Sequence, residues 1–100
     1  MKGITPIELS ELINSATDLQ LIDVRELDEH EAFNIGGLLI PLGQIMAEVE
    51  NIEKEKPVIV YCRKGIRSQI AIQRLQNKYQ FDNLINLTGG TDTWKKEFPL

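Results

Sequence analysis

The stretch Val58-Ile59-Val60-Tyr61-Cys62-Arg63-Lys64-Gly65-Ile66-Arg67-Ser68 determines how the rest of the chain is interpreted. Four β-branched or aromatic residues follow Pro57 without a polar interruption, which predicts a buried strand. Apolar residues then recur at mostly three-to-four-residue spacing from Ile66 to Tyr79, which predicts a helix. The loop between these two elements contains the single cysteine of the chain.

The residues around Cys62 are of the types that make a thiol reactive. A cysteine attacks as its thiolate, and nearby cations or a helix N-terminus lower its pKa from about 8.5. The following helix supplies free backbone N–H groups, and Gly65 permits a conformation in which consecutive amides surround the sulfur. We therefore predict an anion-binding loop with Cys62 as the catalytic nucleophile. The residues expected to bind the substrate are Arg63, Lys64, Gly65, Ile66, Arg67 and Ser68.

Each of these residues also has an ordinary structural interpretation. A lone cysteine at the end of a strand is more often a small core residue than a nucleophile. Neighbouring cations commonly form a solvated turn. The combination is harder to explain in this way, because ligands of open α/β sheets bind at the carboxyl ends of the strands, where Cys62 is expected to lie.

The spacing of the loop is its most specific feature. Cys62, Arg63, Gly65 and Arg67 fill all four positions of the pattern C-R-x-G-x-R or T. The loop therefore resembles the active-site loop of the rhodanese family of sulfurtransferases. Protein tyrosine phosphatases, rhodanese-like cell-cycle phosphatases and arsenate reductases carry C-x-x-x-x-x-R, and the extra residue leaves room for a tetrahedral oxyanion. The shorter loop of this chain suits a sulfur atom.

Two further segments support this resemblance, which spans nearly the whole chain. A D-V-R-E run begins at Asp23, and in the rhodanese family its aspartate and arginine mainly hold the fold, so Asp23 and Arg25 are interpreted as structural. A later run resembles the family's closing L-x-G-G-x-x-x-W and ends at Trp94, which we expect in the core. The glycines of this run allow the backbone to turn sharply beside the neighbouring loop.

Two observations set limits on the resemblance. Phe33 and Asn34 replace the glycine and histidine that many family members have, which leaves the shape of the pocket rim undefined. His30 is the only histidine, and it lies in a charged run that is interpreted as a solvated helix face. A role as a base requires His30 to lie beside Cys62, and no sequence feature indicates this.

The resemblance implies a sulfurtransferase that needs no metal and no organic cofactor. The thiolate of Cys62 takes the sulfane sulfur of a small anionic donor such as thiosulfate and holds it as a persulfide. The acceptor is cyanide in the laboratory, and a thiol or a protein in the cell. We expect Arg67 to anchor the loop and offset negative charge while Arg63 and Lys64 steer the anion. The alternatives are a persulfide carrier, a non-catalytic rhodanese module that binds a partner protein and, with less support, a cysteine phosphatase or arsenate reductase.

Length and composition narrow the classes of function. One hundred residues predict a single domain over residues 1–100. The net charge of −4 argues against binding to nucleic acid, and no apolar run reaches the length of a membrane span. A single cysteine excludes an intramolecular disulfide and a zinc site built from several thiolates. A free reactive thiol fits a reducing compartment, so we expect the cytoplasm; the oligomeric state stays open.

The alternation of predicted strands and helices indicates an α/β fold. Strands are expected over residues 2–4, 19–24, 38–40, 58–61 and 81–87, and helices over residues 6–14, 26–33, 42–52, 66–79 and 91–98. Thr5 is expected to cap the first of these helices, with Pro6 at its first position and Glu8 completing a capping box. Such alternation implies right-handed crossovers and a mostly parallel sheet. We therefore predict a rhodanese-like three-layer sandwich with a roughly five-stranded central sheet and helices on both faces.

Overall fold

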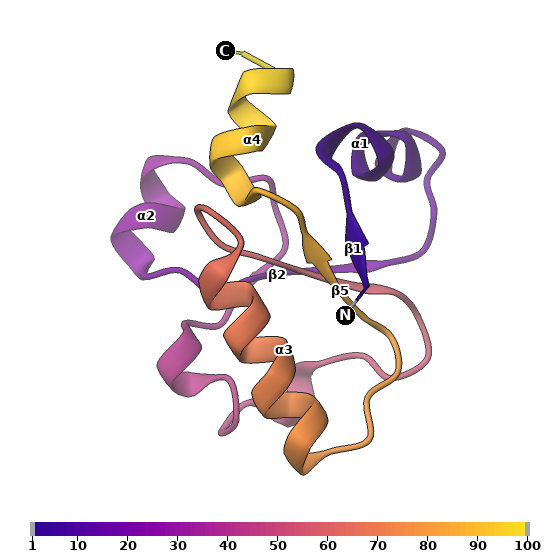
Figure 1. The fold of residues 1–100 in the computed structure, drawn as a ribbon, viewed down its shortest axis with the longest axis vertical. Coiled ribbons are helices and arrows are strands. Elements are labelled where there is room, and N and C mark those ends of the chain that lie inside the picture. The colour runs from indigo at the N-terminus through magenta and orange to yellow at the C-terminus, as the bar shows by residue number, and fades with distance from the viewer. Residues whose placement is uncertain (1, 100) are drawn as a thin grey trace.

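Strands and helices alternate along the chain in the computed structural model, which describes residues 2–99 (Figure 1). The strands are β1 (Gly3–Ile4), β2 (Gln20–Asp23), β3 (Leu38–Leu39), β4 (Val58–Tyr61) and β5 (Leu84–Leu87). The α-helices are α1 (Pro6–Asn14), α2 (Leu27–Ala32), α3 (Ile66–Lys78) and α4 (Gly90–Glu97). Among the described residues, no helix has the length and apolar composition needed to span a membrane.

The five strands form one parallel sheet in the order β1-β5-β4-β2-β3. β4 lies at the centre, paired with β2 on one side and with β5 on the other. This arrangement confirms the predicted five-stranded parallel sheet. Because parallel strands end at the same edge, the residue that follows β4 lies at the edge where open α/β sheets bind ligands.

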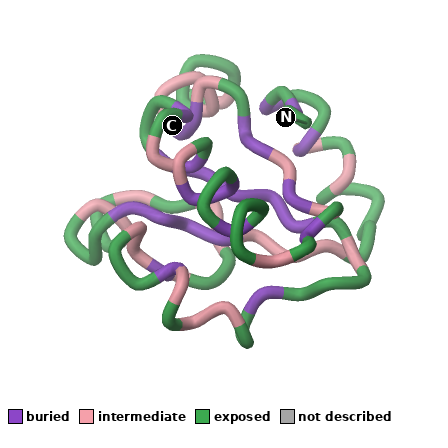
Figure 2. The backbone as a smooth tube through the Cα atoms, turned by 60° about the horizontal axis from the view of Figure 1, so that its bottom comes forward, coloured by how far each residue is buried: buried purple, intermediate pink, exposed green. Residues whose placement is uncertain are grey.

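The alternating side chains of β4 pack into two separate hydrophobic clusters, one on each face of the sheet. Val58 and Val60 belong to the cluster that contains Ile72 and Leu75 of α3. Ile59 and Tyr61, which point to the opposite face of the sheet, belong to the other cluster. That cluster contains Leu9 of α1 and has Trp94 of α4 packed against it. Helices therefore cover both faces, and Figure 2 shows the buried strands between the exposed outer surfaces.

The chain between β3 and β4 differs from its prediction. Instead of one helix over residues 42–52, it forms two short 3-10 turns, η1 (Leu42–Gln44) and η2 (Val49–Asn51). Gly43 weakens a helix here, and the backbone departs from helical angles at Glu48 (φ −108°, ψ 23°). Because the helix is broken, the side chains of Ile45 and Ile52 can both be buried, with exposures of 0% and 2%. The free energy gained by burying them outweighs the weak local preference for a helix.

The first helix begins as its sequence predicts. Thr5 accepts the N–H of Glu8 at 3.1 Å, and the Glu8 carboxylate accepts the N–H of Thr5 at 2.9 Å. Pro6 occupies the first turn, where it sacrifices no helical hydrogen bond. This capping box satisfies two N–H groups that would otherwise lack partners.

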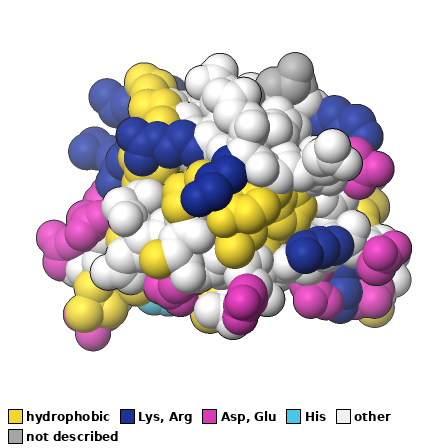
Figure 3. All heavy atoms as spheres, turned by 90° about the horizontal axis from the view of Figure 1, so that it is seen from below, with side chains coloured by type: hydrophobic (Ala, Val, Ile, Leu, Met, Phe, Trp, Pro, Cys, Tyr) yellow, Lys and Arg dark blue, Asp and Glu magenta, His cyan; other side chains and the backbone are white. Residues whose placement is uncertain are grey.

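The end of the molecule where α3 finishes presents hydrophobic side chains beside charged ones (Figure 3). A pocket of about 380 Å³ on this side is lined by Val49, Tyr79 and Phe81 together with residues of both charge signs. α3 has 13 residues, so this pocket lies about 20 Å from the loop that precedes α3. It includes no residue predicted for the functional site.

Candidate active site

Cys62 lies immediately after β4, and a short loop connects it to α3, which begins at Ile66 as predicted (Figure 1). Gly65 precedes α3 in the left-handed conformation, with φ 92°, so it supplies the turn that the sequence predicts. A Cβ atom at Gly65 would lie 3.4 Å from the backbone nitrogen of Gly89. That separation is an ordinary van der Waals contact, so it is the left-handed backbone conformation that favours glycine here.

Two backbone amides of this loop and helix point at the sulfur of Cys62. Sγ accepts the N–H of Gly65 at 3.1 Å and the N–H of Ser68 at 3.4 Å. The hydroxyl Oγ of Ser68 lies 3.4 Å from the same sulfur. Cys62 is only 1% exposed, but it is one of the residues that line a pocket of about 350 Å³. The other residues that line this pocket are Arg63, Lys64, Ile66 and Arg67.

The predicted site residues therefore separate into two groups. Gly65 and Ser68 contact the sulfur, whereas the four remaining predicted binding residues form the wall of the pocket. Ile66 was expected on the apolar face of α3, but its side chain is 63% exposed at the mouth of the pocket. The buried face of α3 is formed instead by Ala71, Ile72 and Leu75.

Arg67 makes an ion pair that the sequence analysis did not predict. Its two terminal nitrogens bind the two carboxylate oxygens of Glu29, on α2, at 2.7 and 2.9 Å. This bidentate contact lowers the pKa of Glu29 to about 2 and raises the pKa of Arg67. Arg67 therefore anchors α3 to α2. We had expected its positive charge to offset negative charge at the sulfur, but Glu29 balances much of that charge.

The Arg67–Glu29 pair predicts how stability depends on pH. The pKa of Glu29 falls from 4.5 to about 2 on folding, so the pair stabilises the protein above pH 4.5 and loses this effect as the pH falls toward 2. We expect Glu29→Gln to reduce the free energy of unfolding at pH 7 by about 1 kcal/mol, because the pair is partly exposed. Denaturant unfolding at pH 7 and pH 2 should show the difference at pH 7 only.

Glu31→Gln is the matched control for this prediction. Glu31 lies on the same helix, is exposed, and makes no ion pair among the described residues. Its replacement should change the free energy of unfolding by less than about 0.5 kcal/mol at either pH. Equal effects of the two substitutions at pH 7 would show that the Arg67 contact contributes nothing to stability.

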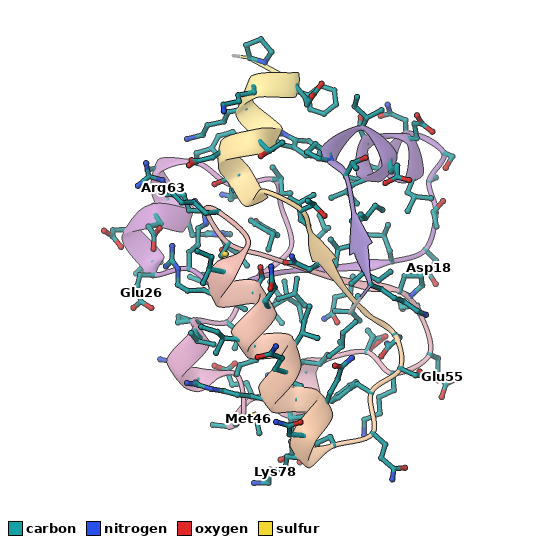
Figure 4. All side chains as sticks on the ribbon, in the orientation of Figure 1. Asp18, Glu26, Met46, Glu55, Arg63 and Lys78 are labelled. Carbon is teal, nitrogen blue, oxygen red and sulfur yellow. The ribbon has the colours of Figure 1, made fainter. Side chains whose placement is uncertain are left out.

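Arg63 and Lys64 are both exposed at the mouth of the pocket. Arg63 lies 3.2 Å from the carboxylate of Asp92, with both side chains open to solvent (62% and 37% exposed). Figure 4 labels Arg63 beside α2, on the left of the view. Exposed pairs of this kind are weak, so both cations remain able to attract an approaching anion.

The N-terminus of α4 holds the backbone of the cysteine loop. The N–H of Thr91 donates to the carbonyl of Cys62 at 2.9 Å, and the N–H of Asp92 donates to the carbonyl of Arg63 at 3.0 Å. Gly90 makes this approach possible, because a Cβ atom there would lie 2.3 Å from the Cys62 carbonyl oxygen. The glycines of the closing motif thus turn the chain beside the loop, as predicted.

Asp23 and Arg25 form a buried cluster behind the site. Arg25 donates from Nε and Nη2 to the two carboxylate oxygens of Asp23 at 2.9 and 2.8 Å, and Nη2 also donates to the carbonyl of Phe33 at 2.6 Å. Both residues are almost fully buried, at 0% and 4% exposure. Neither makes a hydrogen bond to Cys62 within the part of the chain that the structure describes, which agrees with a structural role.

The interpretation of His30 as part of a solvated helix face was wrong. Its Nδ1 atom lies 2.8 Å from the carboxylate of Asp23, and its side chain is 21% exposed. α2 turns His30 inward toward the buried Asp23, a contact between residues of different elements that a charged local sequence does not reveal. No hydrogen bond joins His30 to Cys62 among residues 2–99, so the geometry supports no base role.

Asn86 is a component of the site that the sequence analysis missed. It lies on β5, next to β4 in the sheet, and is 6% exposed. Its Oδ1 atom accepts the hydroxyl proton of Ser68 at 2.5 Å. A polar residue in an otherwise apolar strand is the only sequence feature that could have indicated this position.

Comparison with known proteins shows which protein family this chain is similar to. A protein-family model described as Rhodanese-like domain matches residues 5–97. The thiosulfate sulfurtransferase GlpE of Coxiella burnetii is 36% identical over 99 residues, which covers 98% of this chain and 91% of that protein. A putative sulfur carrier protein of Bacillus subtilis, YrkF, is 31% identical over 83 residues, 82% of this chain and 44% of that protein.

The fold has close counterparts among solved structures. A rhodanese-related protein from Thermoplasma volcanium aligns with a TM-score of 0.84 and 25% sequence identity. The alignment covers 98% of this chain and 94% of that one. A protein of nearly the same extent therefore has a similar fold.

Proposed function

The chain belongs to the rhodanese-like domain family, and from that premise we propose that it is a sulfurtransferase that carries sulfane sulfur on Cys62. The observation that supports the role of Cys62 most strongly is the pair of amide donors, from Gly65 and Ser68, that point at its sulfur. Donors in this position stabilise negative charge on the sulfur, as does the N-terminus of the 13-residue helix α3.

In the first half of the proposed reaction, the Cys62 thiolate attacks the outer sulfur of thiosulfate. A new S–S bond forms to Cys62 while the S–S bond of thiosulfate breaks, and sulfite leaves with the bonding electron pair. The products are a Cys62 persulfide anion and sulfite, so three negative charges are present on each side. The reaction needs no metal or organic cofactor, because the cysteine sulfur forms the covalent intermediate.

In the second half, a thiophilic acceptor removes the outer sulfur. Cyanide attacks this sulfur, the S–S bond breaks, and thiocyanate leaves while the Cys62 thiolate is regenerated. A thiolate acceptor reacts in the same way and becomes a persulfide. The pocket beside Cys62 has room for the added sulfur, and the exposed cations Arg63 and Lys64 lie where an incoming anion must pass.

Incubation with thiosulfate should add the mass of one sulfur atom to the protein. Intact-mass spectrometry measures this gain, and cyanide should remove it and release an equivalent amount of thiocyanate. Mercaptopyruvate, glutathione persulfide and an aryl phosphate, tested in parallel, compare the donor classes. If thiosulfate leaves the mass unchanged while another sulfur donor increases it, the proposal of thiosulfate as donor is wrong. Turnover of the aryl phosphate alone would favour the phosphatase alternative.

A persulfide carrier is the second candidate, and the similarity to YrkF supports it. A carrier uses the same cysteine and the same amides, so the two candidates differ in rate and in acceptor. A carrier should load one sulfur and release it slowly to cyanide and small thiols, but rapidly to a protein thiol. Repeated fast turnover with cyanide would identify the enzyme instead.

A further inference from the structure

We propose that Asn86 is a positioning residue that reverses the hydrogen bond between Ser68 and the Cys62 sulfur when that sulfur ionises. This inference rests on the proposed function, because it concerns the thiolate that attacks the donor. Asn86, Ser68 and Cys62 come from β5, α3 and the loop after β4, respectively, and all three are buried, with exposures of 6%, 0% and 1%.

The direction of the hydrogen bonds depends on a single proton. A serine hydroxyl has one proton to donate and lone pairs with which to accept. Here Ser68 donates that proton to Oδ1 of Asn86 at 2.5 Å, so Oγ presents a lone pair to the sulfur 3.4 Å away. This arrangement suits the neutral thiol, whose S–H donates to Oγ. It does not suit the thiolate, which has no proton to donate.

Asn86 has the chemistry to correct this mismatch. Its side-chain amide carries an acceptor at Oδ1 and two donors at Nδ2, and Nδ2 makes no hydrogen bond among residues 2–99. Rotation of the amide therefore breaks no hydrogen bond from Nδ2 to another described residue. It brings Nδ2 toward Ser68, where it donates to Oγ and frees the hydroxyl proton for the sulfur. The thiolate then accepts from two amides and one hydroxyl, and Asn86 itself neither gains nor loses a proton.

The charged groups around Cys62 cannot perform this function. Arg67 is held by Glu29, Arg63 lies beside Asp92, and Lys64 is exposed at the mouth of the pocket. Their charges are fixed while the sulfur loses its proton, so they favour the thiolate without responding to it. The neutral amide of Asn86 can alternate between accepting and donating.

The parent protein provides the first test, by nuclear magnetic resonance during a pH titration. The side-chain amide resonances of Asn86 should shift with the same midpoint as the ultraviolet absorbance of the thiolate. Asn83 is an internal control, because its Nδ2 already donates to the carbonyls of Glu53 and Lys56 at 2.8 Å each. Its resonances should stay constant. If the Asn86 resonances stay constant as well while the thiol ionises, the proposal is wrong.

Ser68→Ala then tests whether the hydroxyl connects the two groups. In this variant the thiol still ionises, but the shift of the Asn86 resonances should fall to less than half of its parent size. An unchanged response would mean that Asn86 senses only the charge of the sulfur through space, and it would overturn the proposal.

Asn86→Asp provides an independent test through the rate of alkylation of Cys62 at pH 7. A carboxylate only accepts, so it holds the Ser68 proton away from the sulfur, and alkylation should be about tenfold slower than in the parent or slower still. The negative charge of the carboxylate also disfavours the thiolate directly, and this smaller part of the effect persists when Ser68→Ala is added. In the Ser68→Ala background, Asn86→Asp should therefore slow alkylation by less than about threefold. Equal slowing in both backgrounds would contradict the proposal, and circular dichroism checks that each variant is folded.

These measurements require no sulfur transfer. A protein that fails to accept sulfur from thiosulfate can still show the linked titration of Asn86 and Cys62, in which case only the proposed function is wrong. Conversely, if the protein takes up sulfur normally but the amide resonances of Asn86 do not shift as Cys62 ionises, this inference is wrong and the proposed function still holds.

Discussion

Cys62→Ser should reduce thiocyanate formation from thiosulfate and cyanide to the background rate, a loss of at least about a thousandfold. Serine has nearly the shape of cysteine, but its hydroxyl remains protonated at neutral pH and cannot form a persulfide. The amides of Gly65 and Ser68 would then point at an atom without reactivity toward sulfur. A colorimetric thiocyanate assay measures the rate, and intact-mass spectrometry should show no added sulfur.

The control for this prediction is the stability of the same variant. Cys62 lies within the hydrophobic cluster under α3, so the substitution should cost about 1–2 kcal/mol and leave the fold intact. Thermal unfolding and circular dichroism can verify this. A folded variant that retains the parent rate would show that the sulfur of Cys62 takes no part in turnover, and the proposed mechanism would fail.

Gly90→Ala should strongly destabilise the protein, because a methyl group at this position would overlap the backbone of the cysteine loop. The new Cβ would lie 2.3 Å from the Cys62 carbonyl oxygen and 2.5 Å from the Arg63 backbone, at a left-handed φ of 62°. We expect a loss of about 3 kcal/mol or more in the free energy of unfolding. For a domain of this size, the melting temperature should fall by about 12 °C or more.

Gly43→Ala is the matched control, because a Cβ at Gly43 would have no atom within 4 Å. It should change the melting temperature by no more than about 3 °C. The activity of folded Gly90→Ala is a second measurement, since displacing α4 also displaces the carbonyls of the cysteine loop. Equal melting temperatures for the two variants would contradict the close packing of α4 against the loop.

The features that depend only on residues close together in the sequence could be predicted from it. The apolar run before Cys62 predicted β4, the capping box at Thr5 predicted the start of α1, and Gly65 predicted the turn into α3. Each of these follows from backbone preferences over a few residues. The parallel sheet followed in turn from the alternation of the elements, because crossover connections allow few other arrangements.

The features that the sequence did not predict depend on contacts between distant residues. Arg67 binds Glu29, which is 38 residues away in the sequence, and Ser68 donates a hydrogen bond to Asn86, which is 18 residues away. His30 was assigned to the solvent because its neighbours are charged, yet it contacts the buried Asp23. Local composition contains no information about which side chains the fold brings face to face, so the ion pairs and hydrogen bonds of the site could not be predicted from it.

The dependence of the cysteine loop on α4 also has a consequence for biosynthesis. The amides of Thr91 and Asp92 that hold the loop are added to the growing chain almost thirty positions after Cys62 itself. While the ribosome is extending this stretch, the thiol exists without the backbone contacts that shape its surroundings. A nascent chain in which α4 has not yet formed is therefore expected to present an ordinary cysteine, open to oxidants and alkylating agents, and to acquire its special reactivity only once α4 packs against the loop.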